Sequence, residues 1–254
     1  MMAVLARSVL VTGSNRGIGL ELVRQLAASP WPPHHIFATC RHPEGPRGKR
    51  RLHDLLEPSS PLLFAPPDTV NVPSIQGAVR AVDSHLKDQG LNLLINNAGV
   101  SSHATLHSLD SQEMLSVFAT NVVGTLQEFL PLLEKAAKGA GKEGLSCSRA
   151  AVINVSTKLG SIGLCLGVLQ APMYPYRASK AAQNMVTRCL AVELQEKGIL
   201  CAAIHPGWVK TDMGTEEAPL MVEHSVRGIL TVLASLSQDT SGTFLDWEGN
   251  SLPW

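Results

Sequence analysis

Three glycines near the amino terminus of the 254-residue sequence have the spacing of an anion-binding turn. An apolar, β-branched stretch leads into them in the run Val9-Leu10-Val11-Thr12-Gly13-Ser14-Asn15-Arg16-Gly17-Ile18-Gly19, and an amphipathic pattern follows. A strand, a glycine turn and a helix in this order bring unpaired backbone N–H groups and the positive end of the helix dipole to one point. Glycine also lets a phosphate approach the backbone without a Cβ in the way. The run therefore predicts a phosphate-binding turn; its alternative is a tight strand-to-helix turn that needs glycine for shape alone.

Tyr176 and Lys180 form a second candidate for chemistry. They lie four residues apart at the start of an expected helix, so their side chains share one face. Free tyrosine has a pKa of about 10, roughly three units too high for efficient proton transfer near neutrality. A neighbouring ammonium favours the phenolate, and three units correspond to about 4 kcal/mol of selective stabilisation. The pair is either an acid–base site or an exposed amphipathic pair.

The elements that position these residues follow from hydrophobic periodicity. Short apolar runs alternate with longer helical patterns, which predicts βαβ units around a parallel sheet. We expect strands at 8–12, 36–40, 62–64, 91–96, 150–156, 200–205 and 242–246, and helices at 17–28, 73–89, 111–138, 176–197 and 222–235. The predicted fold is a single α/β domain over residues 1–254. It is a doubly wound Rossmann sheet of about seven parallel strands with helices on both faces, and its site lies along the carboxyl edge.

Five motifs, in order along most of the chain, resemble those of the short-chain dehydrogenase/reductase superfamily. They are Thr12-Gly-x-x-x-Gly-x-Gly, Asn96-Asn97-Ala98-Gly99, Asn121, Tyr176-x-x-x-Lys180, and Pro206-Gly207 with Thr211. The runs 205–214 and 242–254 look like the sniffer-type carbonyl reductase branch of that superfamily. The resemblance implies an NADP-dependent oxidoreductase that reduces a small-molecule aldehyde, ketone or quinone.

The resemblance also implies roles for the catalytic candidates. Tyr176 would donate a proton to the carbonyl, and Lys180 would stabilise the phenolate and bind the nicotinamide ribose. The family motif Asn-x-Ser-Ser-x-x-Gly reads Asn154-Val155-Ser156-Thr157-Lys158-Leu159-Gly160 here. Thr157 therefore takes the position of the hydroxyl that holds the substrate oxygen, with Ser156 as the alternative.

Two asparagine positions leave alternatives open. Asn121 lies inside the expected helix 111–138, although its side chain competes for backbone hydrogen bonds. It marks a helix kink or, as the resemblance implies, holds a water that links Lys180 to solvent. Asn96, with Ala98 and Gly99, would form the floor under the adenosine; alternatively, Asn96 and its neighbour tie adjacent strands together.

The type of nicotinamide cofactor is predicted from the end of the second expected strand. The strand ends Ala38-Thr39-Cys40-Arg41, with no acid to bind a ribose 2′-hydroxyl. Arg41 and Arg16 would instead bind the 2′-phosphate of NADP. The resemblance adds further cofactor contacts, which are Gly13, Ser14, Asn15, Gly17, Ile18, Gly19, Asp68 near the adenine, Pro206, Gly207, Val209 and Thr211.

Composition limits the classes of partner. The formal net charge is zero, so nothing in the overall charge favours nucleic acid or an anionic membrane. Five cysteines are odd in number and scattered, as in reduced intracellular proteins. No apolar run approaches the roughly 20 residues of a membrane helix, and the histidine pairs lack the further ligands of a metal site. Because the first strand begins within a few residues of Met1, we expect no signal peptide and a cytoplasmic protein.

The substrate and the assembly are expectations of the same kind. The substrate pocket would be lined by residues 159–174 and by the stretch after Thr211, both rich in small and apolar residues. The resemblance implies a homodimer or homotetramer. The alternative functions are a catalytically silent NADPH-binding regulatory protein with the same fold, and an enzyme that runs the reaction toward alcohol oxidation.

Overall fold

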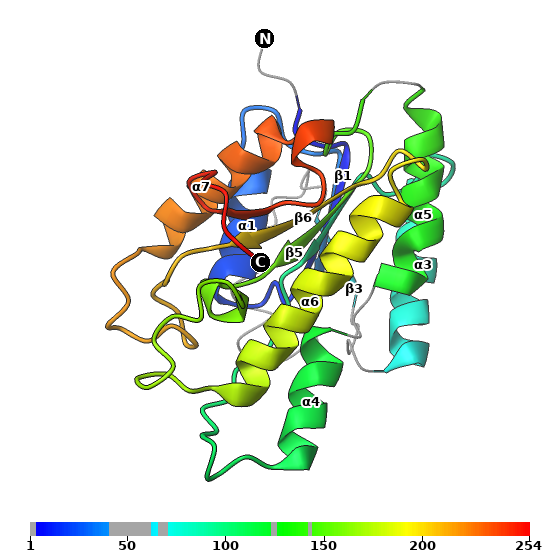
Figure 1. The fold of residues 1–254 in the computed structure, drawn as a ribbon. Coiled ribbons are helices and arrows are strands. Elements are labelled where there is room, and N and C mark those ends of the chain that lie inside the picture. Colours follow the sequence, from blue (N-terminus) through cyan, green and yellow to red (C-terminus); the bar gives the residue numbers. More distant parts are fainter. Residues whose placement is uncertain (1–3, 41–61, 66–70, 123–125, 142–143) are drawn as a thin grey trace.

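Seven strands form one parallel sheet in the part of the chain that the structure, a computed structural model, describes. The described residues are 4–40, 62–65, 71–122, 126–141 and 144–254 (Figure 1). The strand order is β3-β2-β1-β4-β5-β6-β7. The bounds are β1 (Ser8–Thr12), β2 (His35–Thr39), β3 (Leu62–Ala65), β4 (Leu93–Asn96), β5 (Ala151–Val155), β6 (Leu200–His205) and β7 (Phe244–Asp246). The order reverses between β1 and β4, which creates the crevice in which open α/β sheets bind ligands.

Helices cover both faces of the sheet. They are α1 (Gly17–Ala27), α3 (Val72–Leu86), α4 (Ser111–Asn121), α5 (Leu126–Gly139), α6 (Tyr174–Glu193) and α7 (Val222–Ser235), with short 3-10 helices η1 (Lys158–Gly160) and η2 (Gln238–Thr240). Figure 1 shows α1 and α7 on one side and α3, α5 and α6 on the other. The predicted doubly wound α/β fold is confirmed.

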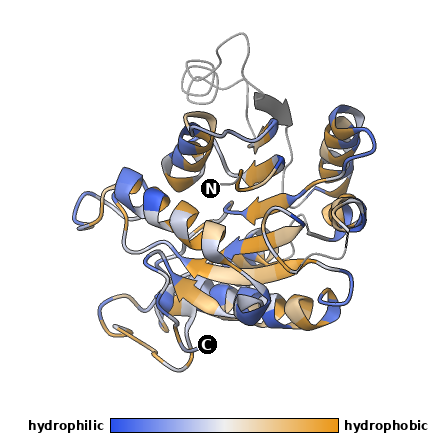
Figure 2. Cartoon of the chain, turned by 90° about the horizontal axis from the view of Figure 1, so that it is seen from above, coloured by the Kyte–Doolittle hydropathy of each residue, from blue (hydrophilic) through white to orange (hydrophobic). Residues whose placement is uncertain are grey.

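Two hydrophobic cores hold these layers together. One packs Leu22 of α1 and Ile229 of α7 against the sheet, and the other packs Val82 of α3 and Phe129 of α5 against the opposite face. The strands are hydrophobic along most of their length, as parallel strands covered on both faces must be, whereas the helices mix hydrophobic and hydrophilic residues (Figure 2). The cores keep the carboxyl ends of the strands in register at one edge.

The expected single helix over 111–138 is wrong, because the chain forms two helices there. Helix α4 ends at Asn121, and α5 begins at Leu126. The Asn121 side chain forms hydrogen bonds with the backbone N–H and carbonyl of Val100, which lies outside the helix. Asparagine therefore ends this helix, which agrees with the kink expected as one alternative.

Strands β1 and β6 and helix α7 have the expected bounds, and the other element boundaries differ from expectation by a few residues. Helix α6 begins at Tyr174, two residues early, because Pro175 stands in its first turn, where a missing N–H costs nothing. Strand β7 begins at Phe244 because Gly242 has φ +77°. Within the described residues, no helix is both long and apolar enough to cross a membrane.

Candidate active site

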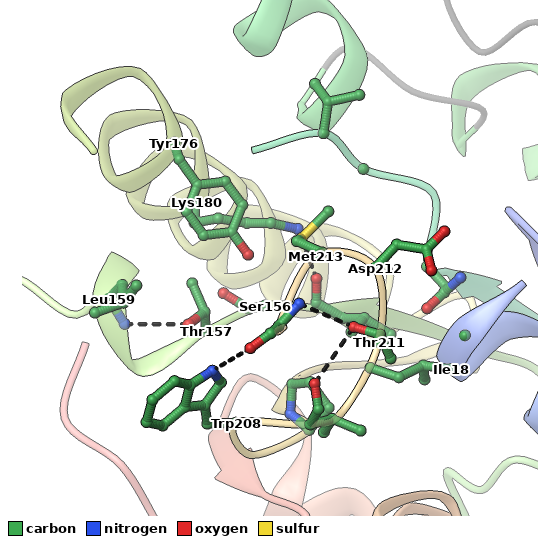
Figure 3. A pocket seen from close by; sticks show the side chains of 18 of the residues that line it. Ile18, Ser156, Thr157, Leu159, Tyr176, Lys180, Trp208, Thr211, Asp212 and Met213 are labelled. Atoms are coloured by element: carbon green, nitrogen blue, oxygen red, sulfur yellow. Dashed lines mark hydrogen bonds between the residues drawn. The ribbon is translucent and has the colours of Figure 1, made fainter. Parts of the chain in front are cut away.

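A cavity of about 1140 Å³ lies along the carboxyl edge of the sheet (Figure 3). Its walls come from segments that are distant in sequence. They are the glycine turn (Gly13, residues 15–18), Thr39 and Cys40 after β2, residues 97–100 with His103 and Thr105 after β4, Thr120, residues 155–159, residues 170–173, Tyr176 and Lys180 of α6, and residues 205–209, 211–215 and Glu217 after β6. The fold thus brings the predicted cofactor and catalytic motifs to one place.

The glycine turn is shaped for close backbone approach. Gly13 has φ +69°, and a Cβ at Gly19 would lie 2.3 Å from the Gly13 carbonyl oxygen. Asn97 holds the turn from the neighbouring strand, since its Nδ2 donates to the Thr12 carbonyl at 2.9 Å and to the Gly13 carbonyl at 3.3 Å. The Thr12 hydroxyl in turn accepts the N–H of Ala98 at 2.9 Å. The turn is therefore fixed before any ligand binds.

Three of the predicted cofactor residues lie outside the cavity wall and have structural partners. Ser14 is buried and donates its hydroxyl to the Val11 carbonyl at 2.5 Å. Asn96 Nδ2 donates to the side-chain oxygen Asn154 Oδ1 at 2.9 Å, joining β4 to β5, which favours the strand-tying alternative. Gly19 is buried behind Gly13. Arg41 and Asp68, also predicted to bind the cofactor, lie outside the described residues.

Tyr176 and Lys180 project from one face of α6 into the cavity. The Tyr176 hydroxyl points toward the strand end that carries Ser156 and Thr157 (Figure 3). Lys180 is buried, and its ammonium donates to the Val155 carbonyl at 2.7 Å and to Gln183 Oε1 at 2.9 Å. Sequence reasoning missed Gln183, although its position three residues after Lys180 puts it on the same helix face.

Burial governs the protonation of both side chains. It raises the pKa of Tyr176 to about 12 and lowers the pKa of Lys180 to about 8. In the protein by itself, burial outweighs any effect of Lys180 on the tyrosine pKa. The physical reason is that desolvation disfavours both charged forms, and the hydrogen bonds of the ammonium go to Val155 and Gln183. The expected lowering of the tyrosine pKa, which relies on a cationic nicotinamide as well as on the ammonium, stays a prediction.

The candidate hydroxyls of Ser156 and Thr157 differ in whether a protein acceptor already receives their proton. The buried Ser156 hydroxyl donates to Asn184 Oδ1 at 2.6 Å. The Thr157 hydroxyl oxygen accepts the N–H of Leu159 at 3.2 Å, which orients it at the start of η1 (Figure 3). Within the described residues, no protein acceptor receives the Thr157 hydroxyl proton. Thr157 thus has a donor available to the cavity, whereas Ser156 has used its donor.

Asn121 connects α4 to the start of α6. Its Oδ1 accepts the Val100 N–H and its Nδ2 donates to the Val100 carbonyl, both at 2.9 Å. Nδ2 also donates to Ser179 Oγ at 2.9 Å, and that hydroxyl donates to the Tyr176 carbonyl at 2.8 Å. Asn121 therefore acts as a clamp on the backbone around the cavity.

Comparison with known proteins agrees with this geometry. Residues 7–220 match the family model for short chain dehydrogenases. The chain belongs to the short chain dehydrogenase family. The C-signal protein of Myxococcus xanthus is 34% identical over 177 residues, which is 69% of this chain and all of that protein.

Two solved structures resemble this short chain dehydrogenase over nearly its whole length. The NADPH-bound carbonyl reductase from chicken fatty liver is 45% identical with a TM-score of 0.94, over 98% of this chain and 94% of that one. The carbonyl reductase Sniffer of Drosophila melanogaster is 40% identical with a TM-score of 0.92, over 98% and 100%. The predicted likeness to the sniffer-type branch is confirmed.

Sequence reasoning missed His205 of this short chain dehydrogenase, which lies in the cavity wall at the end of β6. Its Nδ1 is buried and has no hydrogen-bond partner among the described residues. Burial, and then the nearby Lys158 ammonium, lower the pKa of His205 to about 4, against the opposing effect of the Asp246 carboxylate. The imidazole is therefore neutral at physiological pH. Its place directly before Pro206-Gly207 was a signal that the sequence offered.

The segment after β6 of the short chain dehydrogenase forms a braced loop on the other side of the cavity. Trp208 Nε1 donates to the Gly214 carbonyl at 2.7 Å, and the Gly214 N–H donates to Thr211 Oγ1 at 3.0 Å (Figure 3). Asp212 at its tip forms an ion pair with Arg16 of the glycine turn, 2.5 Å from Nη1 to Oδ2. Sequence reasoning placed Arg16 in the cofactor site but missed Asp212 as its partner.

Proposed function

We propose that this short chain dehydrogenase reduces carbonyl groups of small apolar aldehydes, ketones or quinones with NADPH. The observation that carries the proposal is the meeting of three features in one cavity. These are a preformed phosphate-binding turn, a phenol on α6 and an uncommitted hydroxyl donor at Thr157. The NADPH-bound state of the chicken carbonyl reductase, at 45% identity, supports this cofactor.

The residues present fit a dinucleotide phosphate. The glycine turn opens α1, whose first N–H groups and dipole favour an anion. Arg16 at the cap of α1 carries a guanidinium suited to the 2′-phosphate, and Arg41 would assist it. Ala98 and Gly99 leave room for the adenosine, and Val209 and Thr211 would contact the carboxamide and the phosphate. When bound, NADPH supplies the hydride.

The protein's own groups handle the carbonyl oxygen. Burial keeps the phenol of Tyr176 protonated by raising its pKa. Proton transfer needs a more acidic phenol, and the Lys180 ammonium together with the positive charge of a bound nicotinamide would supply this by favouring the phenolate. The Thr157 hydroxyl donates a hydrogen bond to the same oxygen and stabilises that charge. Lys180 would bind the nicotinamide ribose, and its ammonium would stabilise the phenolate left after proton transfer.

The cavity lining supports substrates of modest polarity. Leu159, Pro172, Met173, Trp208 and Met213 present apolar side chains around the reacting groups. Such surfaces favour apolar ligands, with a few polar groups that fix their orientation. Aldehydes, ketones and quinones meet both requirements better than charged acids.

The test follows NADPH absorbance with a panel of aldehydes, ketones and quinones. Wild-type protein should oxidise NADPH in the presence of at least one class. Tyr176→Phe should lower turnover by about two to four orders of magnitude, because the proton donor is lost. It should bind NADPH with unchanged affinity, which shows that the variant is folded. Absence of NADPH oxidation with the whole panel, despite tight binding, would favour the regulatory alternative.

We also expect a cytoplasmic homo-oligomer. Large apolar side chains on the outer faces of α4 and α6 support this, because Leu115 and Met185 are each 64% exposed and Val192 is 70% exposed. Such patches mark association surfaces. Sedimentation of the purified chain tests the assembly, and a purely monomeric species would contradict it.

A further inference from the structure

The ion pair between Arg16 and Asp212 joins two cavity-lining segments that are distant in sequence. Arg16 caps α1 at the glycine turn, and Asp212 lies at the tip of the loop after β6, 196 residues away. Both residues line the cavity, and their side chains are 47% and 62% exposed. The pair therefore stands at the opening of the site that the cofactor must occupy.

The pair has a different setting from the other ion pairs of the described residues. The Arg24–Glu21 pair lies within α1, and the Lys197–Glu134 pair joins segments remote from the cavity. None of these other pairs connects two cavity-lining segments. An exposed pair adds little to folding because water screens it and both side chains lose freedom. Its position, not its stability, requires an explanation.

The loop holds the Asp212 carboxylate in place. The Thr215 N–H donates to the Thr211 carbonyl at 2.9 Å and closes a turn around Asp212. The hydrogen bonds of Trp208 and Gly214 brace the same turn. These bonds fix the backbone of the loop around Asp212, from which the carboxylate reaches Arg16.

A carboxylate oxygen and a phosphate oxygen are equivalent partners for a guanidinium. We propose that Asp212 is a specificity-determining residue whose carboxylate competes with the cofactor's 2′-phosphate for Arg16. The inference rests on the proposed role of Arg16. Binding of NADPH must displace or share the Asp212 contact, and the negative carboxylate also repels the phosphate. Asp212 therefore limits the affinity for NADP(H) and speeds the release of NADP⁺, a step that limits turnover in many enzymes.

The experiment compares Asp212→Asn with wild-type protein by calorimetric titration of NADPH and NADH. Asparagine keeps the shape of aspartate and removes its charge. The Kd for NADPH should fall about two- to fivefold, the range expected for loss of one exposed charge contact. The Kd for NADH should not change, because NADH has no 2′-phosphate. Stopped-flow measurement should show NADP⁺ release slowed by the same factor.

The matched control is Glu134→Gln, which removes the carboxylate of the exposed pair with Lys197 away from the cavity. It should leave both cofactor affinities unchanged. A higher Kd for NADPH in Asp212→Asn would overturn the inference, because Asp212 would then position Arg16 for binding. Unchanged affinity, or an equal change for both cofactors, would also overturn it.

Arg16→Met separates this inference from the proposed function. If Arg16→Met leaves the NADPH-to-NADH affinity ratio unchanged, the proposed role of Arg16 fails. If Arg16→Met lowers the ratio but Asp212→Asn has no effect, only the competition fails. In the Arg16→Met background, most of the gain from Asp212→Asn should disappear, because no guanidinium remains for the two anions to share.

Discussion

The two ends of the cavity differ in whether backbone or side chains form the surface offered to a ligand. At the glycine turn, the surface offered to a ligand is mainly backbone, shaped by Gly13 and Gly19 and fastened by Asn97. At the reaction end, the surface is made of side chains, and Tyr176 and Lys180 have pKa values displaced by burial. Backbone groups do not titrate, so the glycine-turn end can bind a ligand but cannot exchange protons with it. The side chains at the other end can titrate.

The difference also explains how each end tolerates substitution. Gly13 and Gly19 leave no space for a Cβ, so a side chain at either position moves backbone atoms. The reaction end is held by side-chain hydrogen bonds, such as the one from Ser156 to Asn184, and single groups can be removed while the shape remains. Changes at the glycine end should therefore affect stability and binding together, whereas changes at the reaction end should affect turnover alone.

Thr157→Val tests the reaction end, and its expected effect is second only to that of Tyr176→Phe. Valine keeps the β-branched shape but has no hydroxyl to donate to the substrate oxygen. Turnover should fall by about two orders of magnitude, as on loss of one oxyanion donor, with little change in NADPH affinity. Steady-state kinetics measure the effect. Ser156→Ala is the matched control and should retain near-normal turnover; the reverse pattern would transfer the role to Ser156.

Gly19→Ala tests the glycine end. The added methyl group would lie 2.3 Å from the Gly13 carbonyl oxygen and 2.5 Å from Asn97 Nδ2, so the turn must shift. We expect a loss of about 2 kcal/mol in the free energy of unfolding and a clear loss of NADPH affinity, measured by denaturant titration and calorimetry.

Gly77→Ala is the control for that experiment. Gly77 lies in α3, and its nearest neighbour for a new Cβ is a flexible Arg80 nitrogen at 3.9 Å. Alanine there should leave stability unchanged or raise it by up to about 1 kcal/mol, since it favours helix. Equal changes in stability and NADPH affinity in Gly19→Ala and Gly77→Ala would contradict the expectation that the glycine turn is specially sensitive to an added Cβ.

His205→Asn tests burial at the reaction end through pH. The unfolded histidine titrates near pH 6.5 and the folded one near 4. Between these values the unfolded chain binds more protons, so His205 lowers stability as pH falls through this window. Because the ring is partly exposed, we expect the variant to recover about 1–2 kcal/mol at pH 4 relative to pH 7. Denaturant titration at both values measures it, and a pH dependence of stability that is unchanged in His205→Asn would contradict the expectation.

The sequence predicts the fold well because its signals are local. Strands β1 and β6 and helix α7 have the expected bounds, since hydrophobic period and turn residues define them. A kink at Asn121 was predicted as one alternative, but the complete break of the helix was not, because it depends on a hydrogen bond to Val100 across a loop. Most residues of the predicted motifs line the cavity, whereas Ser14, Gly19 and Asn96 lie outside its wall. Asp212 was missed because its partner Arg16 lies 196 residues away, and His205 was missed because its burial arises only in the folded protein.

The protonation of Tyr176 shows a second limit of sequence reasoning. The four-residue spacing correctly places Lys180 on the same helix face, yet it says nothing of desolvation. Lys180 is buried in the folded protein, and its ammonium donates a hydrogen bond to the Val155 carbonyl. Both are products of the folded sheet and not of α6 by itself.

The Asn121 clamp has a consequence for communication within the molecule. The side-chain amide of Asn121 donates to the Val100 carbonyl and to Ser179 Oγ. The Ser179 hydroxyl in turn donates to the Tyr176 carbonyl in the first turn of α6. The same helix α4 that ends at Asn121 carries the exposed Leu115 on its outer side. Through this chain of hydrogen bonds, the end of α4 and the backbone of Tyr176 are held in one fixed arrangement, without any bond that passes through the sheet.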